Sequence, residues 1–308
     1  MSVILIDANN LARRSFSLVA LSYQGKRTEV VFFSLRQVLN YMRKFAPVEV
    51  IFVWDGALDK RRLQIFPEYK AKRPTLEEEM LRDFRSQRSR MQEVFHKLGF
   101  PQIRAANREA DDVIATLVRH LQVGAIIVST DKDYFQLLNE SVVYNPAKGK
   151  IYDESQLIEE FGIFPSEYPL WKAIVGGHDG IPGLYRVGER GARFIIEFLR
   201  EGRQPETKYE EKALEKFMAA KEEIERFRRV SELMNVPLEE IKAGITVKKF
   251  LSFKLWCVEA YAVLKSLGFN FYLERFAEFM SPFRDLFERR AVRNAIFSHE
   301  GGYDFFAR

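Results

Sequence analysis

The residues of this chain most able to do chemistry are acidic side chains that stand beside apolar runs. They are seven carboxylates in the first half of the sequence: Asp7, Asp55, Glu109, Asp111, Asp112, Asp131 and Asp133. Charges of one sign that lie close together repel each other strongly unless cations lie among them. Oxygen ligands with few His or Cys residues nearby favour Mg²⁺ or Mn²⁺. If folding brings them together, these carboxylates indicate a metal-dependent enzyme that acts on phosphates.

Each acidic group stands where a predicted secondary-structure element begins or ends. Asp7 ends the apolar run 3–6, Asp55 follows the run 50–54, and Asp131 and Asp133 follow the run 125–130. Short β-branched runs separated by helical stretches predict buried parallel strands. Ligands of an open α/β sheet bind at the carboxyl ends of its strands. Three strand ends and the start of the amphipathic stretch 109–118 should therefore meet at one edge of one sheet.

The apolar pattern predicts an α/β core over residues 1–165 and a mostly helical part over residues 166–308. Within the core, helical spacing covers residues 30–45 and 76–98, and a short strand covers residues 142–144. Beyond residue 165 no strand pattern is visible. The helices predicted there cover residues 206–230, 248–266 and 270–279. We expect the two parts to pack as one body.

Each acidic group taken alone also has an ordinary structural explanation. Asp7 and Asp55 could cap helices or stabilise turns. Acids at residues 109–112 favour the dipole of a helix start, and Asp131 and Asp133 could lie in a surface turn. These explanations do not account for four such groups at element ends in one alternating pattern, which favours a shared site.

Residues 60–90 form a basic segment, with ten basic residues against five acidic ones. Aromatic and proline residues stand among the basic side chains. The residues concerned are Lys60, Arg61, Arg62, Lys70, Lys72 and Arg73, with Phe66, Tyr69 and Pro74. Such a tract can bind a phosphate backbone and stack on bases. A solvated charged helix has a similar composition, so the segment alone leaves both explanations open.

A glycine-rich segment at residues 176–191 contains a further acid, Asp179. Glycines and Pro182 before a helix start expose backbone N–H groups, which suits a phosphate or a site near a bound cation. A plain turn between two helices is the alternative.

The overall composition suits a polyanionic partner. The net charge is +5 and the pI is about 9.1, as in many nucleic-acid-binding proteins. Cys257 is the only cysteine, which excludes a disulfide framework within the chain; we expect it in the core of a protein from a reducing compartment. No apolar run of 18 residues and no signal-peptide pattern occurs, so the sequence predicts a cytoplasmic protein without a membrane span.

These features, in this order, resemble the 5′ nucleases, the family of the flap endonucleases of bacteriophages and of bacterial DNA polymerase I. The segments that carry the resemblance are residues 6–16, Trp54-Asp55-Gly56, Tyr69-Lys70-Ala71-Lys72-Arg73, Glu109-Ala110-Asp111-Asp112 and Ser129-Thr130-Asp131-Lys132-Asp133. Residues 182–192 resemble the family's helix–three-turn–helix element. The resemblance implies a PIN-like parallel-sheet core, a helical arch at about residues 60–90, and a helix–three-turn–helix element at about residues 170–200.

The resemblance also implies a phosphodiesterase that uses two divalent ions, Mg²⁺ or Mn²⁺. Asp7, Asp55, Glu109 and Asp111 would hold the first ion, with Asp112 bridging or behind it, and Asp131, Asp133 and Asp179 would hold the second. One ion would generate the attacking hydroxide and the other would stabilise the leaving oxygen. Lys70 and Arg73 would contact the scissile phosphate. The implied DNA contacts are Arg14, Arg61, Arg62, Tyr69, Lys72, Gly183, Gly188 and Arg190, with Tyr69 stacked on a terminal base.

Two segments depart from the family pattern. The family's glycine loop usually carries two acids, whereas Gly176-Gly177-His178-Asp179-Gly180 carries one and is one residue shorter. This predicts a weak second cation site, with His178 as a loop residue without a metal role. The family's Gly-Ile-Gly turn, whose carbonyls usually form a K⁺ site, is Arg186-Val187-Gly188 here.

The predicted function is that of a structure-specific 5′-3′ exonuclease or flap endonuclease. Its expected partners are DNA 5′ ends, flaps or RNA-primer junctions, with a replication polymerase as a candidate protein partner and the chain itself a monomer. One alternative is a PIN-type single-strand ribonuclease, although the arch and glycine loop are not typical of that class. The other is a branched-DNA binding module whose metal site has eroded at Gly176 and Gly177. The arginines after about residue 280 predict either a further contact surface or a packing helix.

Overall fold

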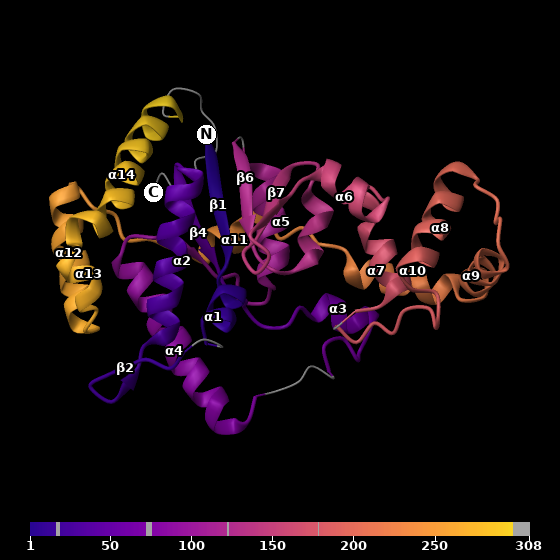
Figure 1. Cartoon of the computed structure of the whole chain (residues 1–308), viewed down its shortest axis with the longest axis horizontal. Helices are drawn as coiled ribbons and strands as arrows, with labels where there is room; N and C mark the ends of the chain where they lie inside the picture. Colours follow the sequence, from indigo (N-terminus) through magenta and orange to yellow (C-terminus); the bar gives the residue numbers. More distant parts are fainter. Residues whose placement is uncertain (17–18, 72–75, 122, 178, 298–308) are drawn as a thin grey trace.

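A mixed sheet of seven strands lies at the centre of the protein (Figure 1). The computed structural model describes residues 1–16, 19–71, 76–121, 123–177 and 179–297. The strands, in their order across the sheet, are β8 (Lys150–Tyr152), β7 (Ser141–Asn145), β6 (Gly124–Val128), β1 (Ser2–Asp7), β4 (Glu49–Val53), β5 (Gln102–Ile103) and β9 (Ile245–Thr246). The inner pairs from β7 to β5 are parallel, and β8 and β9 run antiparallel to their neighbours. The predicted α/β core with a mostly parallel sheet is confirmed.

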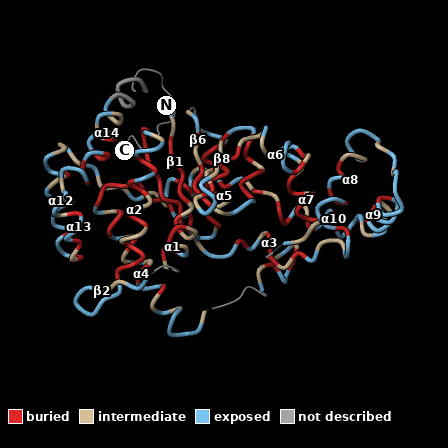
Figure 2. The backbone as a smooth tube through the Cα atoms, viewed as in Figure 1, coloured by how far each residue is buried: buried red, intermediate tan, exposed pale blue. Residues whose placement is uncertain are grey.

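Helices cover both faces of this sheet because the side chains of its strands alternate between them. In β1, Ile4 and Ile6 point into one apolar cluster, and Val3 and Leu5 point into the other. The first face is covered by α1 (Ala8–Phe16), α2 (Glu29–Phe45) and α4 (Glu78–Lys97); the second by α5 (Ala110–His120), α6 (Glu154–Phe161) and α7 (Tyr168–Val175). Figure 2 shows the central strands buried between these layers. A short hairpin, β2 (Ser22–Tyr23) and β3 (Lys26–Arg27), precedes α2.

The helical part divides between the two ends of the molecule (Figure 1). Beyond α7 lie α8 (Gly188–Glu201), α9 (Lys208–Ala219) and α10 (Lys221–Ser231), whereas α11 (Leu238–Ala243) lies near the central strands. The chain then returns past the sheet, and α12 (Phe253–Ser266), α13 (Asn270–Glu274) and α14 (Phe276–Phe297) lie beside α2 and α4. Trp256 on α12 is buried and donates a hydrogen bond to the Leu98 carbonyl oxygen at 2.8 Å. The last helices therefore belong to the same apolar cluster as the first ones.

Two expectations for the second half of the chain are corrected. A strand does occur beyond residue 165, because β9 pairs with β5 at the edge of the sheet. The helices predicted at 206–230 and 270–279 are each two helices instead: α9 and α10 in the first case, and α13 and the longer α14 in the second. In the described part of the tail, Arg290 forms an ion pair with the buried Glu49 at 2.6 Å and Arg289 donates to the Pro47 carbonyl oxygen at 2.7 Å. These contacts favour the packing helix over a free contact surface.

The basic segment joins two sides of the molecule. It begins with α3 (Lys60–Ile65), which is followed by Phe66, whose ring lies 5.3 Å from that of Phe227 on α10. It ends in α4, where Phe84 lies 5.3 Å from Phe16 on α1. The chain crosses from one side to the other between α3 and α4, and residues 72–75 of this crossing lie outside the described ranges. None of the helices in the described ranges is long and apolar enough to span a membrane.

Candidate metal centre

Three of the predicted carboxylates follow adjacent parallel strands. Asp7 is the last residue of β1, Asp55 comes two residues after β4, and Asp131 comes three residues after β6. Asp7 accepts hydrogen bonds from the Asn10 backbone N–H at 3.0 Å and from Ser129 Oγ at 3.1 Å. Asp55 accepts one from the Ala110 backbone N–H at 2.9 Å. The ends of β1, β4 and β6 and the start of α5 are thus joined at one edge of the sheet, as predicted.

The carboxylates at this edge influence one another's protonation. The pKa of Asp7 is raised to about 7, chiefly by burial and then by the negative charges of Asp55 and Asp131. The pKa of Asp131 is also raised, mainly by burial, with Asp111 and Asp179 adding to the shift. Neighbouring acids that resist ionisation are a common property of functional sites. A divalent cation among them would remove this penalty.

Side chains from the basic segment bind the carboxylates at the start of α5. Glu109 accepts hydrogen bonds from Lys70 Nζ, from Arg62 Nη1 at 2.9 Å and from the Tyr69 hydroxyl at 3.2 Å. Burial and the charge of Asp111 raise the pKa of Glu109, and Lys70 and Arg62 oppose that shift. The protein's own cations therefore neutralise Glu109 in this structure.

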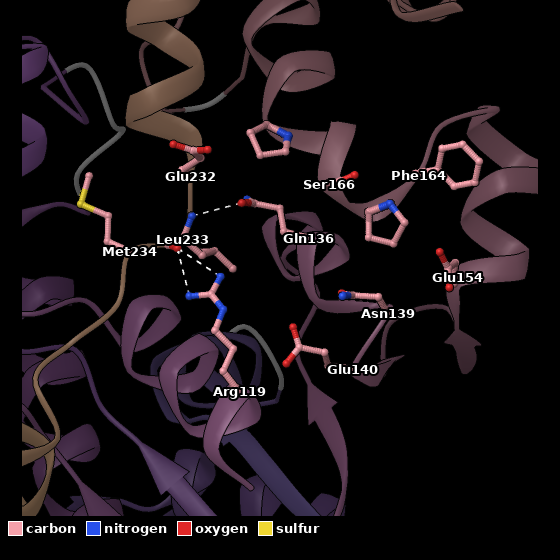
Figure 3. Close-up of a pocket in the computed structure, with 12 residues that line it drawn as sticks. Arg119, Gln136, Asn139, Glu140, Glu154, Phe164, Ser166, Glu232, Leu233 and Met234 are labelled. Atoms are coloured by element: carbon pink, nitrogen blue, oxygen red, sulfur yellow. Dashed lines mark hydrogen bonds between the residues drawn. The ribbon is translucent and has the colours of Figure 1, made fainter. Parts of the chain in front are cut away.

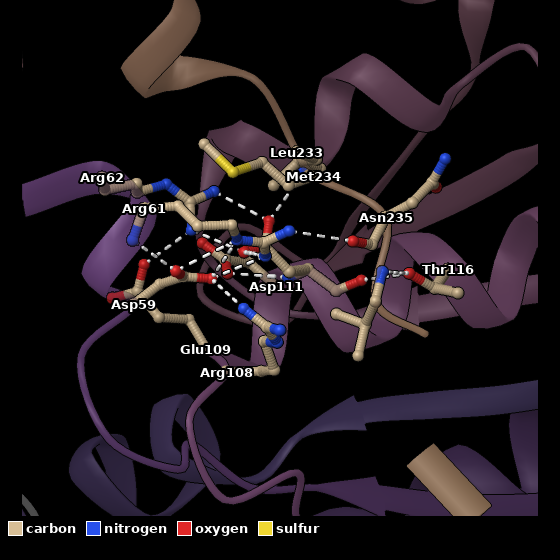
Figure 4. Close-up of polar contacts among 12 residues, drawn as sticks. Asp59, Arg61, Arg62, Arg108, Glu109, Asp111, Thr116, Leu233, Met234 and Asn235 are labelled. Atoms are coloured by element: carbon tan, nitrogen blue, oxygen red, sulfur yellow. Dashed lines mark hydrogen bonds and ion pairs between the residues drawn. The ribbon is translucent and has the colours of Figure 1, made fainter. Parts of the chain in front are cut away.

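Asp112 shares Arg62 with Glu109, which favours the prediction that it lies behind the first cation site over the prediction that it bridges the ions. Asp112 is buried and accepts two hydrogen bonds from Arg62, Nη1 to Oδ2 at 2.6 Å and Nη2 to Oδ1 at 2.8 Å. Figure 4 labels Arg62 among the polar residues of this cluster. The Met234 backbone N–H also donates to Asp112 Oδ1, at 2.7 Å. Burial alone would lower the pKa of Arg62, but the negative charges of Asp111 and Asp112 both act on Arg62 and raise its pKa.

Arg62 and Tyr69 were predicted to contact DNA, and the structure contradicts both predictions. Arg62 is only 1% exposed, and besides the two acids it binds the backbone carbonyls of Val230 and Glu232. Tyr69 is 4% exposed, and its ring lies in the core while its hydroxyl contacts Glu109. A buried guanidinium and a buried ring have no surface on which to receive a phosphate or a base.

The other basic residues differ in their availability. Arg61 is partly exposed and forms an ion pair with Asp59 at 2.6 Å. Arg14 on α1 donates to Gln37 Oε1 at 3.1 Å. Lys70 has a left-handed backbone (φ 59°), and its N–H donates to the Asp179 carbonyl oxygen at 2.8 Å, which ties the basic segment to the glycine-rich segment. Lys72, Arg73 and His178 lie outside the described residues.

A second acidic group is bridged by a lysine that the sequence analysis did not identify. Lys172 Nζ on α7 lies 2.5 Å from Asp133 Oδ2 and 2.6 Å from Asp179 Oδ2. Burial alone would lower the pKa of Lys172, but Asp133 and Asp179 raise it above its usual value. The pKa of Asp133 is raised to about 7 by burial and by Asp131, against the effect of Lys172. The signal in the sequence was a lone charge within the apolar helix Tyr168–Val175.

The donor set fits hard divalent cations, although its oxygens are dispersed here. Within the described ranges, no three His, Cys, Asp or Glu side chains lie close enough together to bind one ion. Lys70 and Lys172 are bound to the acids at this edge. Oxygen-only ligands whose ionisation is unfavourable without a cation match the chemistry of Mg²⁺ or Mn²⁺. An ion would replace the ammonium groups as the partner of these carboxylates.

The predicted helix–turn–helix segment is formed by α7 and α8. Gly183 has φ 68°, and a Cβ there would lie 2.5 Å from the Val175 backbone, so the turn requires glycine. Gly188 begins α8, and Arg190 follows it with its guanidinium 5.5 Å from the Tyr209 ring. The carbonyl oxygen of Tyr185 accepts from Lys216 Nζ at 2.7 Å, and that of Val187 accepts from the Tyr209 hydroxyl. Two carbonyls of the turn are thus engaged within the protein, and the K⁺ site stays a prediction.

A pocket of about 580 Å³ adjoins the Arg62–Asp112 pair, because Glu232 and Met234, which bind that pair through their backbones, line it (Figure 3). Arg119 donates to the Leu233 carbonyl oxygen at its wall, and Gln136 accepts from the Leu233 N–H. None of the predicted site residues lines it. The pocket and the carboxylate edge are therefore distinct features.

Comparison with known proteins identifies the family. A family model for the 5′-3′ exonuclease N-terminal resolvase-like domain matches residues 2–162, and the chain belongs to this family. A 5′-3′ exonuclease of Aquifex aeolicus is 30% identical over 199 residues, covering 62% of this chain and 68% of that protein. DNA polymerase I of Mycobacterium tuberculosis is 32% identical over 211 residues, covering 64% of this chain. The chain spans only 23% of the length of that polymerase.

Solved structures share the fold. A bacteriophage T5 flap endonuclease in complex with DNA and metal ions superimposes with a TM-score of 0.62 and 20% identity, covering 86% of this chain and 98% of that one. A flap endonuclease from Methanococcus jannaschii gives a TM-score of 0.57 with 12% identity, covering 94% of this chain and 93% of that one. The PIN-like 5′ nuclease fold with its helical C-terminal part is confirmed.

The raised pKa of Asp7 predicts how the metal-free protein responds to pH. Its pKa of about 7 exceeds the ordinary value of 3.8 that we take for the unfolded chain, so the folded state binds more protons between these values. The free energy of unfolding should therefore rise as pH falls from about 7 towards 4. Asp7→Asn should stabilise the protein at pH 8 in EDTA by about 2 kcal/mol, or ~5 °C, and by less at pH 5.

Thermal unfolding at both pH values measures this effect. Asn keeps an oxygen for the Asn10 N–H and can donate to the Ser129 hydroxyl, so the contacts of Asp7 are retained. Asp285→Asn on the exposed surface of α14 is the matched control, and it should leave the melting temperature unchanged. A lower melting temperature for Asp7→Asn than for the wild type at pH 8 would refute the claim that burial and the charges of Asp55 and Asp131 oppose ionisation of Asp7.

Proposed function

We propose that this chain is a structure-specific 5′-3′ exonuclease or flap endonuclease that hydrolyses DNA phosphodiesters with two divalent cations, Mg²⁺ or Mn²⁺. The observation that carries the proposal is the junction of Asp7, Asp55 and the start of α5 at one strand-end edge, in a chain of the 5′-3′ exonuclease family. An edge with this many carboxylates has no evident structural use, because its charges raise each other's pKa.

The ligands fall into two groups. Asp7, Asp55, Glu109 and Asp111 would hold the first cation, and Asp131, Asp133 and Asp179 would hold the second. When bound, the two ions would supply an activated water and stabilise the leaving oxygen. Residues 1–165 form the catalytic part in this proposal, and residues 166–308 form the helical DNA-binding part.

Among the described residues of the basic segment, Lys70 is the best placed to act on the scissile phosphate. Its ammonium is bound to Glu109, and its left-handed backbone is held by the Asp179 carbonyl. Non-glycine residues held in this conformation cluster at functional sites. With a cation held by Glu109, the Lys70 ammonium would be free to stabilise the developing charge on the phosphate.

The remaining residues are proposed to contact DNA. Arg14 would bind a backbone phosphate beside β1, Arg61 would steer the strand, and Lys72 and Arg73 would add charge beside Lys70. Gly183, Gly188 and Arg190 would contact duplex DNA through the turn between α7 and α8. We expect a cytoplasmic monomer that acts on 5′ ends, flaps or RNA-primer junctions, with a replication polymerase as partner.

Lys70→Ala should lower the single-turnover cleavage rate by more than about tenfold, which corresponds to roughly 1.4 kcal/mol of transition-state stabilisation. DNA affinity should change little, because the ammonium is directed at the reacting phosphate. Rapid-quench kinetics at saturating protein separates the rate from the affinity.

Lys60→Ala provides the matched control from the same segment, because Lys60 is exposed. It should weaken binding in a salt-dependent way and reduce the slope of log affinity against log salt by about 0.9. The assignment of Lys70 to catalysis and Lys60 to DNA binding is wrong if both variants lose DNA affinity equally and neither loses cleavage rate at saturating protein.

The proposal is tested by incubating the protein with a labelled 5′-flap DNA and, separately, with single-stranded RNA in the presence of Mg²⁺. Cleavage of the flap DNA is the expected result. Cleavage of RNA alone would favour a ribonuclease, and binding of the flap without cleavage would favour a DNA-binding module.

A further inference from the structure

Lys172 occupies the space between two carboxylates that would hold the second cation. Its side chain is nine-tenths buried, and its ammonium lies 2.5 Å from Asp133 Oδ2 and 2.6 Å from Asp179 Oδ2. Both carboxylates are themselves buried. An ammonium with two charged acceptors at these distances makes short, charge-assisted hydrogen bonds. The lysine thus provides the positive charge that these acids need when no metal ion is bound.

The neighbouring glycine leaves room for this arrangement. A Cβ at Gly177 would lie 3.2 Å from Lys172 Cε, closer than an ordinary van der Waals contact. Any side chain at position 177 would therefore press on the lysine. Gly177 has no positive φ, so its backbone does not require glycine. The space that it leaves is used by Lys172.

A divalent ion that binds Asp133 and Asp179 must displace the ammonium. The displaced lysine is then a buried charge without its partners, which is costly in a protein interior. Two positive charges at one pair of carboxylates would also repel each other. Entry of the second ion is therefore opposed by the energy needed to move Lys172.

We propose that Lys172 competes with the second divalent cation for Asp133 and Asp179, so that the DNA-free protein binds one ion well and the second only weakly. The first ion is not affected, because Asp7 and Asp55 lie on other strands and do not contact Lys172. Lys172 is thus a positioning residue that sets the metal concentration at which the second site fills. The inference rests on the proposed function in that both require divalent ions at this edge.

The test is a Mn²⁺ titration of the DNA-free protein. Electron paramagnetic resonance measures the concentration of free Mn²⁺, and the number of bound ions is the difference from the total added. Wild-type protein should bind the second ion at least tenfold more weakly than the first. Lys172→Met should lower the dissociation constant of the second ion by at least tenfold and change that of the first by less than twofold. Lys150→Met is the matched control, because Lys150 pairs with Glu160 on the surface, away from both sites. It should behave as wild type.

Lys172→Gln is a second variant in case methionine destabilises the fold, because its amide can still donate to one of the carboxylates. It should show the same tenfold change. Melting temperatures give a readout that does not depend on counting ions: Mn²⁺ should raise the melting temperature of the Lys172 variants more than that of wild type.

Equal second-site dissociation constants in wild type and both Lys172 variants, or equal melting shifts, would overturn the inference. If wild type and variants bind no Mn²⁺ at all, the inference and the proposed function both fail. If the first ion binds normally and the second is independent of Lys172, only the inference fails.

Discussion

Asp55→Asn should reduce Mg²⁺-dependent cleavage by about a thousandfold or more, equivalent to roughly 4 kcal/mol of transition-state stabilisation. Asp55 would be a ligand of the first cation, and the neutral amide binds a hard cation less well than a carboxylate. The fold should be unaffected, because Asp55 is exposed and the amide oxygen can still accept from the Ala110 N–H. Single-turnover kinetics on a 5′-flap DNA measures the rate.

DNA affinity and melting temperature are measured in parallel, to separate catalysis from folding. Asp285→Asn serves again as the control and should cleave as wild type does. Near-wild-type cleavage by Asp55→Asn at saturating Mg²⁺ would show that Asp55 is not a ligand of the catalytic ion.

Arg62→Met should lower the free energy of unfolding by about 3–5 kcal/mol, because it removes one partner of a buried ion pair. This corresponds to a fall in melting temperature of roughly 10 °C. The variant removes both Arg62 hydrogen bonds from the buried Asp112, which keeps only the longer ion pair with Arg61 at 3.7 Å, and it leaves the Val230 and Glu232 carbonyls without this donor. Thermal or urea denaturation in EDTA measures the loss.

The double variant Arg62→Met/Asp112→Leu tests the cause of that loss. Replacing both charges by apolar groups removes the buried carboxylate, and buried ion pairs can often be replaced in this way at little cost. Part of the stability should return, although the Met234 N–H loses its acceptor. Arg82→Met is the control, because Arg82 and its partner Glu78 are both exposed and such a pair should contribute less than about 1 kcal/mol. An Arg62→Met protein as stable as wild type would mean that the Arg62–Asp112 ion pair does not stabilise the fold.

The sequence predicts the fold well where the apolar pattern is long. The helix predicted at 30–45 is α2 (Glu29–Phe45), and the one predicted at 76–98 is α4 (Glu78–Lys97), because both alternate apolar and polar faces over several turns. β9 could not be predicted, because a two-residue strand has no periodicity and exists only through its pairing with β5. The break between α13 and α14 similarly depends on packing against α2.

In the candidate site, too, features set by the local sequence pattern could be predicted, whereas features set by contacts between distant segments could not. The positions of Asp7, Asp55 and Asp131 at strand ends follow from the parallel sheet, and the structure confirms those positions. Their roles as metal ligands stay predictions. The burial of Arg62 and Tyr69 could not be predicted. Composition shows that a segment is basic, but it does not show which of its side chains are buried by the rest of the protein. Lys172 was missed because its partners are contributed by two other segments.

The most direct test of the central claim compares two DNA duplexes that differ only in the polarity of a single-stranded flap. Each is labelled on the flap strand and incubated with the protein in Mg²⁺ or in EDTA, and the products are resolved by length. The account predicts cleavage at or near the junction of the 5′ flap in Mg²⁺, with no cleavage of the 3′ flap and none in EDTA. Equal cleavage of both flaps, cleavage in EDTA, or intact DNA under all conditions would contradict it.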